Sequence, residues 1–199
     1  MKFFPDNLYH IYNQGNNRQQ IFLNREDYLI FLREIRRCIS PSCEIVSYCL
    51  MPNHFHLVSY VDERINSKVK QGGLILDPLV NGIRKLLSGY SRIFNNHNDR
   101  SGSLFRQKTK CKCLTDRTLV NPRYTAQEYT TNCFNYIHQN PLRAGLVSKL
   151  EDWEYSSYLD FAGLRNGTLC NKALARKFCG YNEETFVQDT LGSIDDLPV

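Results

Sequence analysis

Long apolar runs are missing from this chain of 199 residues. No stretch reaches the roughly 18 consecutive apolar residues that a membrane-spanning helix needs. The first residues, Met1 to Asn7, also lack the basic and then apolar pattern of a secretion signal. The sequence therefore predicts a soluble, cytoplasmic protein with no membrane partner, and its length suits one domain with an extension.

The cysteine spacing that marks most zinc sites is also missing. The chain has eight cysteines, but the closest pair, Cys111 and Cys113, is separated by one residue instead of two. Without a secretion signal, disulfide bonds are not expected in a reducing compartment. We therefore predict reduced thiols, and we assign them no function.

Acidic residues are scarce before residue 150. Residues 1–150 contain 21 Lys and Arg against 11 Asp and Glu, a balance of +10, whereas residues 151–199 contain 4 against 9, a balance of −5. A basic body favours a polyanionic partner such as nucleic acid. Surface charge of one sign can also serve solubility alone, so charge does not decide the function.

The apolar pattern predicts alternating strands and helices. Strands are expected at 7–13, 44–50, 54–61 and 103–114, with one helix after Asn24 and another from Pro78. This β-α-β-β-α-β order predicts an α+β fold of the ferredoxin-like (RRM-like) type. Such a fold is one antiparallel sheet with two helices on one face and its first and third strands in the centre.

A further helix is expected after the last strand. Thr125 and Glu128 have the spacing of a capping box, and Pro141 predicts a helix end near Asn140. Three aromatic residues beyond it are expected to pack back on the body, and 171–192 should form short helices. We therefore expect a catalytic domain over 1–160 and a helical extension over 161–199. The three aromatic residues are Trp153, Tyr155 and Tyr158.

Two histidines stand two residues apart in His54-Phe55-His56. On a strand both side chains point to the same face, roughly 6.5–7 Å apart along the backbone, so they can share one metal ion. The other interpretation is a chance pair on a solvated face. By itself the pattern favours that second interpretation.

Tyr136 and Asn140 lie four residues apart and so share one face of the expected helix. A protonated tyrosine is a poor nucleophile, but a divalent cation that polarises a phosphoryl oxygen makes its attack feasible. The alternative is an aromatic side chain packed on the sheet, the commoner fate among the 12 tyrosines. Spacing alone does not choose between them.

Two blocks of sequence carry a resemblance to a known family. Residues 51–58 read MPNHFHLV and residues 136–147 read YIHQNPLRAGLV. Both closely resemble the signature blocks of REP-associated tyrosine transposases, a branch of the single-tyrosine HUH transposases. The match spans residues 8 to about 160 in the family's order. Supporting segments are Tyr9-His10-Ile11, Gly15-Asn16, Ile21-Phe22, Gly102-Ser103-Leu104-Phe105 and Trp153-Glu154-Tyr155-Ser156-Ser157-Tyr158.

The resemblance implies a metal-dependent DNA transposase that cleaves and joins single strands at hairpin-associated sites. His54 and His56 would bind Mg2+ or Mn2+, Asn140 would complete the metal site, and Tyr136 would attack the DNA. The product would be a 5′-phosphotyrosine and a free 3′-hydroxyl, which allows joining without a nucleotide cofactor. His138 should point away from the tyrosine face and pack internally. The implied partner is single-stranded or hairpin DNA, and the protein could be a monomer or a homodimer.

The chain departs from the family at two places. It has Gln14 where Arg is common, and the fourth strand reads Gln107-Lys108-Thr109-Lys110 instead of a Gly-Arg-Phe-Lys type of sequence. Neither change touches the proposed catalytic residues. Both leave the details of DNA contact, and hence the recognised sequence, open.

Basic residues are candidates for phosphate contacts. Four recur every second residue along the expected fourth strand, and others lie on the second helix. They could follow a DNA backbone. Lysines on an edge strand also prevent strand-to-strand aggregation, and the sequence leaves both roles open. The predicted DNA-binding residues are Arg84, Lys85, Arg106, Lys108, Lys110 and Lys112.

Two other functions compete with transposition. The first is a domesticated DNA-binding protein that keeps the fold and motifs without transposing. The second is a metal-dependent phosphodiesterase that uses water as its nucleophile, for which Tyr136 would be dispensable.

Overall fold

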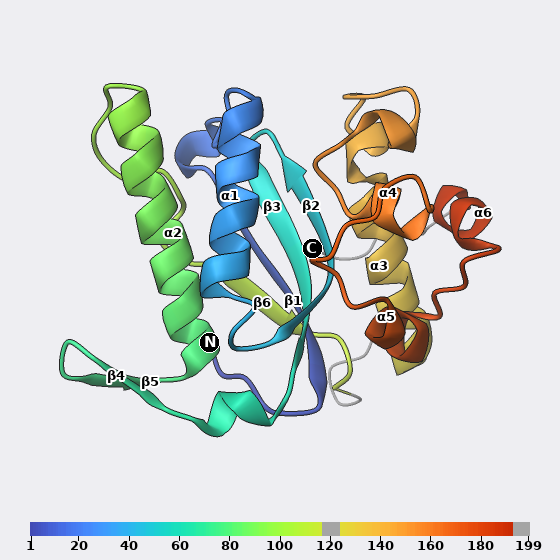
Figure 1. Ribbon diagram of the computed structural model, residues 1–199, viewed down its shortest axis with the longest axis horizontal. Coiled ribbons are helices and arrows are strands. Elements are labelled where there is room, and N and C mark those ends of the chain that lie inside the picture. Colours follow the sequence, from blue (N-terminus) through green and yellow to red (C-terminus); the bar gives the residue numbers. More distant parts are fainter. Residues whose placement is uncertain (117–123, 193–199) are drawn as a thin grey trace.

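A computed structural model of the protein describes residues 1–116 and 124–192. A main sheet lies between two groups of helices, and a small hairpin projects beside α2 (Figure 1). The main sheet contains β1 (Asn7–Gln14), β2 (Glu44–Met51), β3 (His54–Val61) and β6 (Lys110–Cys113). The hairpin contains β4 (Val69–Gln71) and β5 (Leu74–Leu76). The helices are α1 (Arg25–Cys38), α2 (Pro78–His97), α3 (Ala126–Arg143), α4 (Tyr158–Phe161), α5 (Lys172–Cys179) and α6 (Phe186–Leu191), with 3-10 turns at Asn16–Arg18, Glu63–Asn66 and Leu150–Asp152.

The main sheet has the predicted topology. Its order is β2-β3-β1-β6 and every neighbouring pair is antiparallel, so the first and third strands occupy the centre. The ferredoxin-like α+β fold expected from the element order is therefore confirmed. Because β1 and β3 are adjacent along their full lengths, the side chains of β1 lie directly beside those of the histidine strand.

One face of the sheet is covered by α1 and α2, as predicted (Figure 1). Phe31 of α1 contacts both Phe55 of β3 and Tyr90 of α2, and all three rings are almost fully buried. The predicted cap of α1 is present, since the Asn24 side chain accepts from the Asp27 backbone and the Asp27 side chain accepts from Asn24. The cap fixes where α1 begins and hence which side chains face the sheet.

The other face carries a second core made by α3 to α6 (Figure 1). Phe134 of α3 contacts Phe161 and Phe186, and the sheet contributes Val46 and Val58. The predicted short helices in 171–192 are present as α5 and α6. Since residues before and after position 160 share this core, the division into 1–160 and 161–199 stays a prediction, and its last residues lie outside the described part.

An ion pair between buried Asp160 and half-buried Arg165 attaches the segment after α4 to the sheet. The Arg165 guanidinium donates to both carboxylate oxygens of Asp160, at 2.6 and 2.9 Å, and to the Tyr48 hydroxyl of β2 at 2.9 Å. Gly167 lies so close to this carboxylate that a Cβ atom there would stand 2.4 Å from it. Of the predicted aromatic residues, Trp153 donates to the Leu50 carbonyl at 3.1 Å, so this group does pack back on the body.

The fourth strand is shorter than predicted. It was expected over 103–114, but β6 comprises Lys110–Cys113. Asn13 explains the difference. Its side-chain amide donates to the Arg106 carbonyl at 3.1 Å and to the Thr109 hydroxyl at 3.0 Å, in place of a regular backbone ladder. The chain therefore stays beside β1 while its backbone leaves strand geometry.

The predicted end of α3 near Asn140 is also wrong, since the helix continues through Pro141 to Arg143. Proline removes the N–H that would bond the Ile137 carbonyl, a loss that usually ends or kinks a helix. The Asn140 side chain supplies a substitute, because its Nδ2 donates to the Ile137 carbonyl at 3.4 Å. The Asn140 side chain thus donates to the carbonyl that the missing proline N–H leaves without its helical hydrogen bond.

The apolar pattern does not predict the β4–β5 hairpin. Gly72 and Gly73 both have positive φ, +54° and +79°, which suits a two-residue hairpin turn. Leu74 and Ile75 beside the turn are exposed. In the part of the chain that the structure describes, no helix is long and apolar enough to cross a membrane.

Candidate active site

The two histidines lie on the face of β3 opposite the first core. Phe55 between them points into that core, as strand alternation predicts. The register with β1 sets Gln14 opposite His54 and Tyr12 opposite His56. Side chains from both central strands therefore meet on the side that carries the histidines.

A hollow of about 320 Å³ opens over this pair. It brings together residues from β1, β3, the segment before β6, and α3, which are far apart in the sequence. Its lining residues are Tyr12, Asn13, Gln14, His54, His56, Arg106, Lys108, Lys110 and Tyr136. The predicted nucleophile, two predicted metal ligands and three predicted DNA contacts thus share one cavity.

Tyr136 reaches the histidine pair from α3. Its ring centroid is 6.3 Å from that of His56, and the two rings are nearly perpendicular at 80°. On the same helix the Arg143 guanidinium lies 5.8 Å from the centre of the tyrosine ring. The half-buried phenol is therefore close to the imidazoles and to a positive charge, a suitable position for meeting a phosphate.

The other predicted residues of α3 have different positions. Asn140 is buried and does not line the hollow, and its Nδ2 is directed to the Ile137 carbonyl. His138 is fully buried in the second core, where its Nε2 lies 2.7 Å from the Ser157 hydroxyl. The expectation that His138 packs internally agrees with this position.

Both histidines of β3 have side-chain partners at Nδ1. The Nδ1 atom of His54 lies 2.6 Å from Oδ1 of Asn53. The Nδ1 atom of His56 lies 2.8 Å from Nε2 of His10 on β1, and both of these imidazoles are buried. In each case Nδ1 is engaged within the protein, so Nε2 is the nitrogen left for another ligand.

Burial keeps these imidazoles neutral near pH 7. It lowers the pKa of His54 to about 4 and that of His10 to about 3, where nearby Lys112 contributes less. The pKa of His56 is held well below its usual value by burial first and then by its two histidine neighbours. A neutral imidazole is the form that binds a metal ion.

The donor set fits one divalent cation with open coordination positions. No group of three or more His, Cys, Asp or Glu side chains suited to a metal occurs among the described residues. An ion at this site would therefore have the two imidazoles as its ligands from these residue types, with positions left for water or phosphate. Mn2+ accepts such mixed nitrogen and oxygen ligands.

Three of the six predicted DNA-binding residues, Arg106, Lys108 and Lys110, line this hollow. A second hollow of about 620 Å³ lies between α2 and residues 103–109 and is lined by Arg84 and Lys85. It shares Arg106 and Lys108 with the histidine hollow, so basic side chains connect the two. Lys112 differs, because its ammonium lies 4.8 Å from the centre of the Tyr129 ring.

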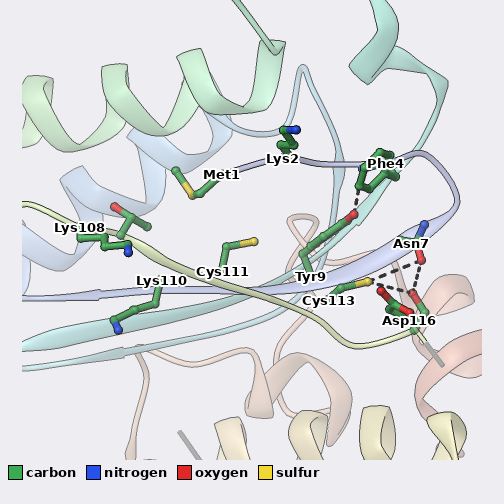
Figure 2. Close-up of a pocket in the computed structure, with 12 residues that line it drawn as sticks. Met1, Lys2, Phe4, Asn7, Tyr9, Lys108, Lys110, Cys111, Cys113 and Asp116 are labelled. Carbon is green, nitrogen blue, oxygen red and sulfur yellow. Dashed lines mark hydrogen bonds between the residues drawn. The ribbon is translucent and has the colours of Figure 1, made fainter. Parts of the chain in front are cut away.

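A larger hollow of about 880 Å³ lies beside β6, and no histidine is among the residues that line it (Figure 2). Its lining includes Lys108, Lys110, Cys111 and Cys113. Burial raises the pKa of Cys111 to about 12, so its thiol is not an activated nucleophile. All eight cysteines are free thiols, as predicted.

Sequence reasoning did not identify four residues of the site: His10, Tyr12, Asn13 and Asn53. The signal was present in β1, where His10, Tyr12 and Gln14 alternate and so share a face. Recognising it required the pairing of β1 with β3, since this register is what sets that face beside His54 and His56.

Comparisons with known proteins agree with the sequence motifs. No family model matches the chain. It is 24% identical over 133 residues to the "Putative REP-associated tyrosine transposase" of Haemophilus influenzae. The match covers 64% of this chain and 69% of that protein.

A solved structure shares the fold. It is that of a REP-associated tyrosine transposase bound to a REP hairpin. It superposes with a TM-score of 0.55 and 14% sequence identity, over 99% of this chain and 92% of the other. In its motifs and its fold the chain is therefore similar to REP-associated tyrosine transposases.

Proposed function

We propose that this protein is a metal-dependent tyrosine transposase that cleaves and joins single strands of DNA beside hairpins. The observation that carries the proposal is the convergence of Tyr136 with His54 and His56 in one hollow rimmed by basic side chains. A metal-binding pair, a phenol and phosphate-binding cations are the groups that phosphodiester cleavage by tyrosine needs.

Tyr136 is the nucleophile in this proposal. Its hydroxyl oxygen attacks the phosphorus, the bond from phosphorus to the 3′ oxygen breaks, and the phenolic proton passes to solvent. The leaving oxygen gains a proton and becomes a free 3′-hydroxyl, while the 5′ phosphate stays on the tyrosine. Attack by another 3′-hydroxyl reverses these steps and joins a new strand, so the energy of the phosphodiester is retained.

His54 and His56 would hold Mg2+ or Mn2+ through Nε2, and when bound the ion would polarise the phosphoryl oxygen. We propose Asn140 as the third protein ligand. Its Nδ2 is directed to the Ile137 carbonyl, which leaves Oδ1 as the amide atom available to a cation. Gln14 also presents an amide in the hollow, opposite His54.

The basic residues would bind the DNA backbone. Arg106 and Lys108 line both the histidine hollow and the groove beside α2, where Arg84 and Lys85 continue the positive surface. Lys110 completes the rim of the histidine hollow. Edge protection of the sheet concerns only Lys110 and Lys112, since Arg106 and Lys108 precede β6. A hairpin or single strand is the proposed partner, and the solved transposase structure with the same fold is bound to a REP hairpin.

A covalent-adduct experiment tests the proposal. The wild type, Tyr136→Phe and the control Tyr60→Phe are incubated with Mn2+ and 3′-labelled hairpin DNAs that carry randomised single-stranded flanks. A 3′ label is required because the strand on the 3′ side of the cut remains on the tyrosine. Tyr60 is a suitable control because its hydroxyl bonds to Asp6, outside the hollow.

We expect a labelled protein in the wild type and in Tyr60→Phe but not in Tyr136→Phe. An adduct that persists in Tyr136→Phe would overturn the assignment of the nucleophile. Cleavage without any adduct would indicate a phosphodiesterase that uses water. Binding without cleavage would indicate a domesticated DNA-binding protein.

A further inference from the structure

We infer that His10 and Asn53 are positioning residues that hold His56 and His54 in the Nδ1-protonated tautomer, so that both imidazoles present an Nε2 lone pair to the same ion. This inference rests on the proposed metal site. It assigns a role to two side chains that would not touch the ion themselves.

The Asn53 contact determines the tautomer of His54. The amide Nδ2 of Asn53 donates to the Arg18 carbonyl at 3.4 Å, which orients its Oδ1 toward the imidazole. That oxygen lies 2.6 Å from Nδ1 of His54 and can only accept. Nδ1 must therefore carry the proton, and Nε2 is left with its lone pair.

The hydrogen bond between His10 and His56 can form in two tautomeric states. If His56 donates from Nδ1 to Nε2 of His10, the Nε2 of His56 is free to bind a cation. If His10 donates instead, the neutral His56 must carry its proton on Nε2 and cannot bind one. The 2.8 Å contact between these buried rings therefore decides whether the second ligand is competent.

Packing holds His10 in place. Its ring stacks on Tyr12 with centroids 4.7 Å apart and on His56 with centroids 5.0 Å apart. Its position on β1 is fixed by the register with β3, which sets His10 opposite Val58, one step along the same face from His56. A partner held this rigidly orients the imidazole as well as its proton.

At each of the two positions, one variant removes the hydrogen-bond acceptor and a second variant retains one. His10→Phe keeps a flat ring but has no acceptor, whereas His10→Gln retains an amide oxygen. Asn53→Leu and Asn53→Asp form the same pair at the second position. His97→Gln is the matched control, since His97 is exposed at the end of α2, outside the hollow.

The first measurement reads the tautomers without metal or DNA. Long-range 1H–15N correlation spectra of the wild type should show protonated Nδ1 in both His54 and His56. An Nε2-protonated His56 in these spectra would overturn the inference. Because the measurement uses no ion, it is independent of whether the proposed metal chemistry is correct.

The second measurement is Mn2+ affinity, from the free ion detected by electron paramagnetic resonance. We expect His10→Phe and Asn53→Leu to weaken binding by about 10- to 100-fold, the usual cost of losing such a partner. His10→Gln, Asn53→Asp and His97→Gln should stay near the wild type. Unchanged affinity in the first pair, or an equal loss in the acceptor-restoring variants, would overturn the inference. If His10→Phe does not fold, the spectra and His10→Gln still decide. A wild type that binds no Mn2+ would contradict the proposed function instead.

Discussion

The two faces of the central sheet have different side-chain environments although they share the same strands. In β3, Phe55 and Leu57 point to a core of aliphatic and aromatic side chains, whereas His54 and His56 point to a hollow lined with polar and charged groups. In β1, Tyr9 and Ile11 belong to the first face and His10 and Tyr12 to the second.

This comparison shows how a site with costly buried polar groups can be tolerated. The first face gains its stability from non-directional burial, which fixes the positions of both strands. The second face then uses directional contacts, such as the 2.8 Å contact between His10 and His56, on a backbone that is already rigid. At the histidines of β3, the hollow and the first core thus lie on opposite faces of one strand, while the second core packs beside the hollow on the histidine face.

The largest expected effect is the loss of Phe55 from the first face. Phe55→Ala leaves a cavity among Phe31, Phe105 and the α2 side chains, and it should destabilise the protein by about 3–5 kcal/mol. Urea unfolding followed by circular dichroism measures this. A loss below about 1 kcal/mol would contradict the assignment of stability to this face.

The neighbouring position should behave in the opposite way. His54→Ala removes a half-buried side chain that we propose as a metal ligand, so the free energy of unfolding should change by no more than about 1 kcal/mol. Adduct formation with hairpin DNA should fall by about 100-fold or more, because a bound cation supplies several kcal/mol to phosphoryl chemistry. If His54→Ala kept its activity and lost its fold, the separation of the two faces would be wrong.

Lowering the pH should reduce the free energy of unfolding through the histidine that is buried in the second core. Burial lowers the pKa of His138 to about 3, below the ordinary value near 6.5 expected in the unfolded chain. Between these values the unfolded chain binds a proton that the native protein does not, so stability is lost as pH falls below about 6.5. Each such histidine contributes at most about 1.4 kcal/mol per pH unit.

The slope of unfolding free energy against pH, between pH 6 and 4, should therefore be shallower in His138→Phe by nearly one proton. His97→Gln is exposed and should leave the slope unchanged. An identical slope in His138→Phe and the wild type would show that this histidine is not kept neutral by burial.

The smallest effect is expected at the rim of the second face. Lys108 and Lys110 line the hollow and are exposed, so Lys108→Gln or Lys110→Gln should not alter folding. Each change should lower the slope of log affinity for hairpin DNA against log salt by about one. Titrations at several salt concentrations measure it. An unchanged slope would exclude phosphate contacts for both lysines and leave edge protection as the role of Lys110.

Periodic patterns predicted most of the sheet, whereas the candidate site followed from the resemblance to a known family. Alternation placed His54 and His56 on one face, and the capping box located the start of α3. The patterns failed where side chains replaced backbone hydrogen bonds. Asn13 shortened β6, and Asn140 allowed α3 to continue through Pro141. Such substitutions depend on three-dimensional neighbours, which a pattern along the chain does not contain.

The histidine partners were missed for a related reason. His10 is separated from His56 by 46 positions, and only the strand register makes them neighbours. Asn53 is adjacent to His54 in sequence, yet its role depends on the orientation of its amide toward Arg18.

The central position of β1 has a consequence for synthesis of the protein. This strand leaves the ribosome before its neighbours β3 and β6, which follow about 50 and 100 residues later, and Tyr136 comes later still. Long-range pairing of this kind slows folding, because loops must close before contacts form. A nascent chain therefore has no assembled hollow until α3 has emerged and docked, so partial translation products should be unable to nick DNA.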